Sequence, residues 1–232
     1  MKNDRKSGLI AGTLYITGTV AGIFSLVFTD GIRSAQDELV YLAGNSNSII
    51  YGAMFILLMG LSLAMIPVIV YPVLKKYHQT FALGYIVFRS GLEAVIYLGM
   101  VISWLLLIPL SQAYMQSGMP QDANYQALST LLLESSALST VLSIVFILGA
   151  SMFYYVLFRS KLVPRWLSIW GLLAAIPSLT AGLLHMSGLL DSLSTTAILM
   201  EMPLAIQEMV LAIWLIVKGF SPSNVLGIAD KN

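Results

Sequence analysis

The feature of this chain that most limits its fold is a set of apolar segments, each long enough to cross a lipid bilayer as a helix. About 20 mainly apolar residues are needed, because each residue of an α-helix adds ~1.5 Å and the hydrocarbon core of a bilayer is ~30 Å thick. We therefore predict an all-α fold, a polytopic membrane helical bundle that forms a single transmembrane domain over residues 1–232. The six expected helices are residues 8–29, 48–73, 81–110, 127–158, 166–186 and 195–217.

Composition agrees with this class and excludes several kinds of chemistry. Charged residues make up 10% of the chain and hydrophobic residues 58%, whereas soluble domains contain about 25% charged residues. Cysteine is absent, so the chain has no disulfide, thiolate metal site or cysteine nucleophile. Only His78 and His185 are present, too few for a three-histidine zinc site. We predict neither a metal nor a cofactor.

The positions of lysine and arginine predict the orientation in the membrane, because cytoplasmic loops carry an excess of these residues. Only Arg33 lies in a loop predicted to be external. We therefore place both termini in the cytoplasm and the protein in the bacterial inner membrane, with the first helix uncleaved. The short basic clusters give no support to nucleic-acid binding. Ten of the twelve basic residues fall on the predicted cytoplasmic side, namely Lys2, Arg5, Lys6, Lys75, Lys76, Arg159, Lys161, Arg165, Lys218 and Lys231.

Glycines and prolines within the apolar segments predict how the helices pack and where they end. Gly8 and Gly12 are four residues apart, so they share a helix face that another backbone can approach closely. Proline removes a backbone donor and tends to kink or stop a helix. On this basis Pro67 and Pro72 are expected to interrupt the second helix near its end, and Pro109 to end the third.

Two charged residues, Arg89 and Glu93, lie inside the third apolar segment. Their spacing of four residues places them one above the other on the same face of a helix. A charge in hydrocarbon costs at least ~2.5 kcal/mol on insertion scales, so the pair has to face protein, water or each other. The sequence therefore predicts a polar site inside the bundle.

Counting residues from each membrane surface gives the depth of the other polar side chains. Glu208 of the sixth helix falls at a depth compatible with Arg89 and Glu93. Glu134, His185 and Glu201 fall in the outer half of the membrane and form a second group. All six residues are candidates for binding a ligand or a proton, and none is predicted to be catalytic.

The sequence allows three interpretations of the first group. In the first interpretation, Arg89 and its carboxylates form a structural salt bridge that fixes the register of the helices. Alternatively, a glutamate near the middle of the membrane changes its protonation state during transport. In the third interpretation Arg89 binds an anionic ligand. For His185, a position facing water at the membrane surface is the simplest interpretation.

Three segments carry a resemblance to a known family: FRSGLEAVIYL (residues 88–98), LVPRWLSIWGLLAA (162–175) and PLAIQEMVLAIWLIVKGF (203–220). Together they resemble DUF4386, an uncharacterised bacterial family classed only as a domain of unknown function. The resemblance covers nearly the whole chain and implies a multi-pass prokaryotic membrane protein. It implies no catalytic residue and no substrate.

These observations favour a small carrier, sensor or ligand-binding membrane protein with a buried polar site. Its expected partners are membrane lipid and a small molecule or proton, and its oligomeric state is left open. The alternative is a membrane-embedded enzyme that acts on a lipid or isoprenoid through carboxylates such as Glu134 and Glu201. A nucleophile motif of the G-x-S-x-G kind is absent from the sequence, which favours the first interpretation.

The distribution of basic residues makes the topology testable. Reporter fusions after Lys76 and Arg165 should score as cytoplasmic, and fusions near Asp37, Asp122 and Asp191 as external, because lysine and arginine set the orientation. A cytoplasmic signal at Asp122 would contradict the six-helix topology.

Overall fold

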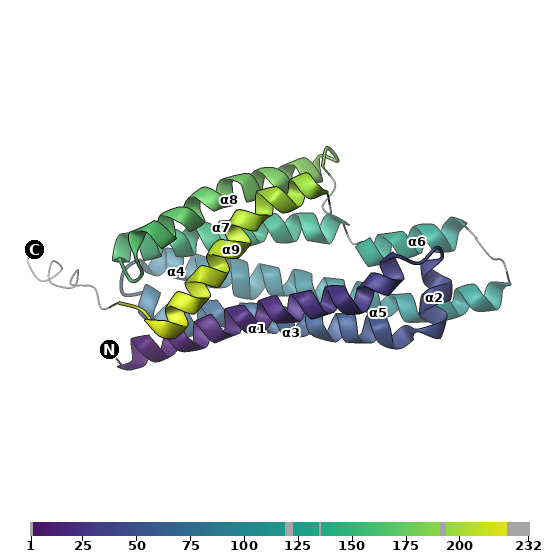
Figure 1. Ribbon diagram of the computed structural model, residues 1–232, viewed down its shortest axis with the longest axis horizontal. Helices are drawn as coiled ribbons and strands as arrows, with labels where there is room; N and C mark the ends of the chain where they lie inside the picture. Colours follow the sequence, from purple (N-terminus) through teal and green to yellow (C-terminus); the bar gives the residue numbers. More distant parts are fainter. Residues whose placement is uncertain (1, 119–122, 135, 191–193, 222–232) are drawn as a thin grey trace, which may run out of the picture. The chain divides into compact units, whose positions relative to one another are not determined.

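The structure is a computed structural model that describes residues 2–118, 123–134, 136–190 and 194–221. Every regular element in these ranges is helical (Figure 1). Six helical spans are long and apolar enough to cross a membrane, so the chain is a multi-pass membrane protein. In chain order the elements are α1 (Lys2–Arg33), α2 (Glu38–Gly44), α3 (Ser46–Leu74), α4 (Gln79–Tyr85), the π-helix η1 (Ile86–Glu93), α5 (Ala94–Ser117), α6 (Ala123–Glu134), α7 (Ser136–Ser160), α8 (Arg165–Met186) and α9 (Thr195–Val217).

The chain divides into two compact units, and each is assembled from separate stretches of sequence. Helices α1 and α3 each contribute one part to either unit. Unit 1 consists of Met1–Ile16, Ser62–Glu93 and Thr140–Asn232, and unit 2 of Thr17–Leu61 and Ala94–Ser139.

One proline, Pro109, does not end its helix where the sequence predicted. Pro109 lies inside α5, which continues to Ser117, and Pro67 and Pro72 both lie inside α3. The expected end of the third helix at Pro109 is therefore wrong. Within a membrane, neighbouring helices, hydroxyl side chains and small backbone adjustments satisfy the groups that a proline leaves free, so the helix persists.

In unit 2, the connection between the first two predicted helices, residues 30–47, is partly helical. Helix α1 continues to Arg33, and Asp37 caps α2 by accepting hydrogen bonds from the backbone N–H groups of Leu39 and Val40. The Tyr114 hydroxyl donates to the other carboxylate oxygen of Asp37 at 2.7 Å. The charge of Asp37 thus stabilises a helix start and joins α2 to α5.

In unit 1, α8 and α9 pack side by side (Figure 1). The side-chain amide of Gln207 in α9 donates to the backbone oxygen of Leu167 in α8 at 3.0 Å. Since Gln207 is fully buried, this hydrogen bond fixes the register of the two helices. It also sets the position of the next residue, Glu208.

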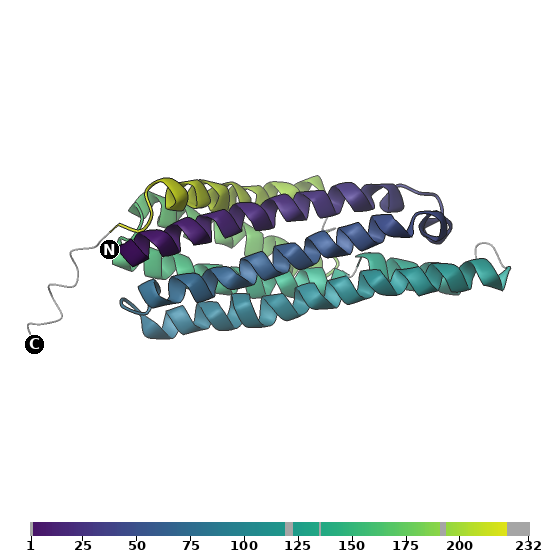
Figure 2. The same ribbon diagram turned by 90° about the horizontal axis from the view of Figure 1, so that it is seen from below.

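One end of unit 1 brings the basic segments together (Figure 2). A β-carbon at Gly8 would lie 3.1 Å from Gly219, and Ser221 N–H donates to Leu162 O at 2.8 Å. Lys76 and Asp4 form an ion pair of 3.0 Å. The start of α1, the connections after α3 and α7, and the end of α9 therefore meet at the same end, as the distribution of lysine and arginine requires. The side of the membrane on which this end lies stays a prediction.

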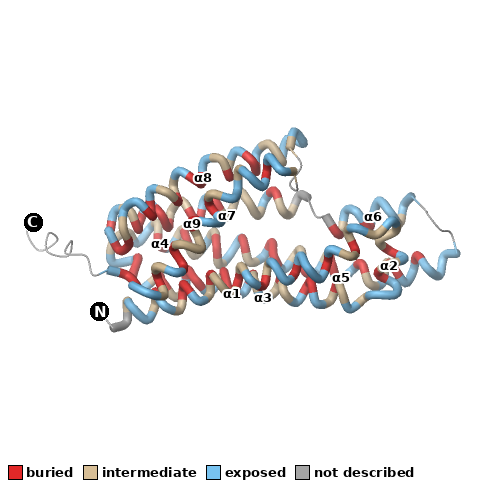
Figure 3. Tube along the Cα trace, in the orientation of Figure 1, coloured by how far each residue is buried: buried red, intermediate tan, exposed pale blue. Residues whose placement is uncertain are grey.

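Buried and exposed positions alternate along the helices (Figure 3). Large apolar side chains such as Val27 and Val95 are more than half exposed, as expected for residues that face lipid. The described core of unit 1, by contrast, contains fully buried polar residues, among them Arg89, Glu93 and Gln207. The interior of unit 1 therefore contains buried polar and charged groups as well as apolar packing.

The close approach of α1 and α9 gives a stability prediction. A methyl group at Gly12 would lie 2.5 Å from the backbone oxygen of Ala212, so Gly12→Ala should force the helices apart. Overpacking of this kind costs about 1–3 kcal/mol, which should lower the thermal unfolding midpoint in detergent. Gly91→Ala is the matched control, because a β-carbon there meets nothing within 4 Å. Equal loss of stability in both variants would contradict the close packing.

Candidate functional site

The local backbone around Arg89 departs from a regular α-helix. Ile86–Glu93 forms the π-helix η1 between α4 and α5. Such segments, with hydrogen bonds from i to i+5, are rare and often occur at functional sites. Ser90 in η1 donates a hydrogen bond of 2.7 Å to the backbone oxygen of Ala64 in α3, which attaches the irregular segment to a neighbouring helix.

Arg89 lies between two carboxylates from different elements. Its Nη1 atom is 3.6 Å from Oε2 of Glu93 in η1, and its Nη2 atom is 3.4 Å from Oε1 of Glu208 in α9. Arg89 and Glu93 are each 1% exposed, and the side chain of Glu208 is 15% exposed. The structure thus brings together the three residues that the sequence placed at compatible depths, all of them in unit 1.

Aromatic side chains surround the guanidinium group of Arg89. Its Cζ atom lies 4.6 Å from the centre of the Phe146 ring and 5.7 Å from that of Tyr15. Contacts of this kind stabilise a desolvated cation by ~2 kcal/mol. A glycine makes the approach of Phe146 possible, since a β-carbon at Gly149 in α7 would lie 3.1 Å from Cβ of Phe88 in η1.

Three buried tyrosines complete the surroundings of the charged cluster. The hydroxyl groups of Tyr15 and Tyr85 are 3.2 Å apart, and the Tyr154 hydroxyl is buried without a hydrogen-bond partner among the described residues. All three lie within electrostatic range of Arg89 and Glu208. Sequence reasoning missed them, because a tyrosine within an apolar segment looks the same whether it packs or lines a site.

The guanidinium of Arg89 has more donors than the surrounding protein uses. It carries five N–H groups, yet its Nε and Nη1 atoms are buried without a hydrogen-bond partner in the described part of the chain. The contacts of 3.6 and 3.4 Å are also longer than the 2.7–2.9 Å of strong charge-assisted hydrogen bonds. The described protein groups therefore leave two of the three guanidinium nitrogens of Arg89 without a hydrogen-bond acceptor.

The second predicted group is only partly assembled. Glu201 in α9 lies within electrostatic range of His185 in α8. The Nδ1 atom of His185 lies 3.0 Å from the backbone oxygen of Leu190. His185, near the end of α8, therefore donates a hydrogen bond to the segment that follows α8. The side chain of Glu134 lies outside the described residues. The described contacts therefore bring two of these three residues near each other.

The charged cluster gives a prediction about compensating substitutions. Removing one partner of a buried ion pair typically costs ~3–5 kcal/mol, whereas replacing all partners with apolar residues is often close to neutral. Arg89→Leu should therefore lower the thermal unfolding midpoint in detergent, and adding Glu208→Leu should restore part of the loss. The triple variant with Glu93→Leu should recover more. Strictly additive losses would show that Arg89 has no carboxylate partner.

Comparison with known proteins agrees with the resemblance seen in the sequence. The family model described as a domain of unknown function (DUF4386) matches residues 10–219, a range that includes Arg89, Glu93 and Glu208. Neither the curated proteins nor the solved structures contain a significant match. The matched range covers most of the chain and all of the buried charged cluster, so this multi-pass membrane protein belongs to the DUF4386 family.

Proposed function

We propose that this protein is a small carrier of the bacterial inner membrane whose buried cluster binds an anionic group together with a proton. The observation that carries the proposal is the buried guanidinium of Arg89, which lies between two carboxylates and has two nitrogen atoms without a hydrogen-bond partner in the described residues. Those donors are suited to a carboxylate or phosphate oxygen.

The charge balance of the cluster supports the binding of a proton. Glu93 and Glu208 together carry two negative charges when ionised, and Arg89 carries one positive charge. An uncompensated charge in a low-dielectric interior is costly, and such groups tend to be neutralised. One proton on either carboxyl group makes the cluster neutral.

Protonation also explains how an anion would enter. A protonated Glu208 no longer attracts Arg89 as an ion, which frees the guanidinium for another negative group. With one carboxyl group already protonated, the cluster stays neutral on binding an anion only if a second proton binds to the other carboxylate, so the anion and this second proton bind together. This coupling between anion binding and proton binding explains why two carboxylates lie beside one arginine.

The irregular backbone around Arg89 supports movement of Arg89 relative to Glu208. Arg89 lies in the π-helix η1, and α9 contains Pro203 shortly before Glu208. Interrupted helices in transporters commonly form binding sites and hinges. A purely structural ion pair would be better served by regular helices and by shorter hydrogen bonds.

The enzymatic alternative has less support from the described contacts. Nδ1 of His185 is engaged by Leu190 O, and Glu201 is exposed rather than enclosed in a site. The structure describes no serine or threonine bonded to either residue. A carrier without chemistry of its own therefore accounts for more of the observed arrangement.

Proton binding can be tested by infrared spectroscopy of the full chain in detergent. At neutral pH the spectrum should contain the carbonyl band of about one protonated, buried carboxyl group per chain, because neutralisation is cheaper than burying the excess charge. Glu208→Gln should remove the band, since one carboxylate then balances Arg89. Glu201→Gln is the control, because it changes an exposed glutamate in the same helix.

The wild type and a double variant also test whether the cluster binds an anion. Acetate or phosphate should raise the thermal unfolding midpoint of the wild type more at acidic than at neutral pH, because the anion binds together with the second proton. Arg89→Gln/Glu208→Gln should not respond. A wild-type spectrum without the carboxyl band, or an anion effect that is independent of pH, would contradict the proposal.

A further inference from the structure

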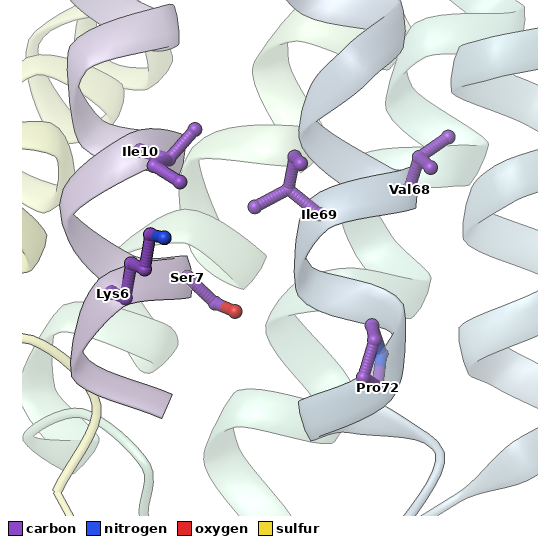
Figure 4. Close-up of a pocket in the computed structure, with 6 residues that line it drawn as sticks. All are labelled: Lys6, Ser7, Ile10, Val68, Ile69 and Pro72. Atoms are coloured by element: carbon purple, nitrogen blue, oxygen red, sulfur yellow. The ribbon is translucent and has the colours of Figure 1, made fainter. Parts of the chain in front are cut away.

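A groove separate from the charged cluster opens between α1 and α3, within unit 1 (Figure 4). Its volume is about 280 Å³. Ser7 and Ile69 point into the gap between the two helices (Figure 4). The groove is lined by Lys6, Ser7 and Ile10 of α1 and by Val68, Ile69 and Pro72 of α3.

The polarity of the groove changes along the helix axes. At ~1.5 Å per residue, Ile10 lies about 6 Å farther from the N-terminal end of α1 than Lys6, and Val68 about 6 Å from Pro72 towards the middle of α3. Lys6 and Ser7 therefore form a polar mouth at the basic end of unit 1, and Ile10, Val68 and Ile69 form an apolar inner part. This order matches that of a membrane lipid, with a polar headgroup above a hydrocarbon chain.

The mouth of the groove carries a positive charge that the protein does not neutralise. Lys6 is exposed, and it has no ion-pair or hydrogen-bond partner among the residues that the structure describes. Asp4, which is close in sequence, pairs instead with Lys76 of the α3–α4 connection at 3.0 Å. That pair also holds α1 near the end of α3, so the groove keeps its shape.

We propose that this groove binds an anionic phospholipid. The phosphate lies against the Lys6 ammonium group and accepts a hydrogen bond from the Ser7 hydroxyl, and the first acyl carbons lie against Ile10, Val68 and Ile69. Basic pockets between transmembrane helices bind acidic headgroups in this way, with ~1 kcal/mol for each lysine near the membrane surface. A soluble small molecule fits less well, because it would stay largely exposed in this open groove, whereas small-molecule pockets bury most of the ligand.

Native mass spectrometry of the full chain, released from vesicles of equal parts phosphatidylglycerol and phosphatidylcholine, tests this site. We expect one phosphatidylglycerol to be retained in preference to phosphatidylcholine. Lys6→Gln should weaken its retention about fivefold, which corresponds to ~1 kcal/mol for one lysine. Lys218→Gln is the matched control, because Lys218 is exposed at the same end of unit 1 but does not line the groove.

A second variant, Ile69→Trp, fills the apolar part of the groove and leaves Lys6 unchanged. It should reduce retention of phosphatidylglycerol even though the basic end keeps its charge. Equal effects of Lys6→Gln and Lys218→Gln would overturn the proposal, because they would show general attraction to anionic lipid. Stabilisation by inorganic phosphate equal to that by phosphatidylglycerol would also overturn it, as would a dimer that Ile69→Trp dissociates. These results are independent of the charged cluster around Arg89.

Discussion

The cost of placing Arg89 inside a membrane-spanning segment is the constraint on which much of unit 1 depends. An ionised guanidinium cannot lose its proton at any ordinary pH, so the surrounding protein has to compensate it. The structure does so with two carboxylates from different elements and with the faces of two aromatic rings. Each of these groups has to be brought to the same depth by a different helix. The packing of α1, η1, α7 and α9 therefore places around Arg89 the groups that compensate its buried charge.

Small residues and side-chain hydrogen bonds make this packing possible. Gly12 lets α1 approach α9, and Gly149 lets α7 approach η1, which positions Tyr15 and Phe146 over the guanidinium. The hydrogen bond from Gln207 to Leu167 O fixes α9 against α8 next to Glu208. Even so, two of the guanidinium nitrogens have no partner among the described residues. If the ion pair were purely structural, we would expect selection to have supplied acceptors for these two nitrogens, because an unsatisfied buried donor costs ~1–3 kcal/mol.

The lengths of the apolar segments and the positions of the charged residues predicted the class of fold correctly. The six spans were predicted because a bilayer imposes a minimum length on any apolar helix, and α8 and α9 begin and end within a residue of the predicted bounds. Local rules performed less well where the environment overrides them. Pro109 did not end its helix, and the connection in which Asp37 lies contains a short helix that Asp37 caps. For Pro109 the membrane and the neighbouring helices override the local rule, whereas Asp37 caps α2 through local hydrogen bonds from Leu39 and Val40.

The sequence by itself determined that this is a multi-pass helical membrane protein, that Arg89 and Glu93 share a face, and that Glu208 lies at a similar depth. These conclusions need only the rise of a helix and the free-energy cost of a charge in hydrocarbon. Only the tertiary structure decided that α9 contacts η1, that Tyr15 and Phe146 cover the arginine, and that the segment holding both charges is a π-helix. Depth is a one-dimensional property that can be counted along the chain. Which helices are neighbours depends on side-chain packing between residues that are distant in sequence, and counting along the chain carries no information about that.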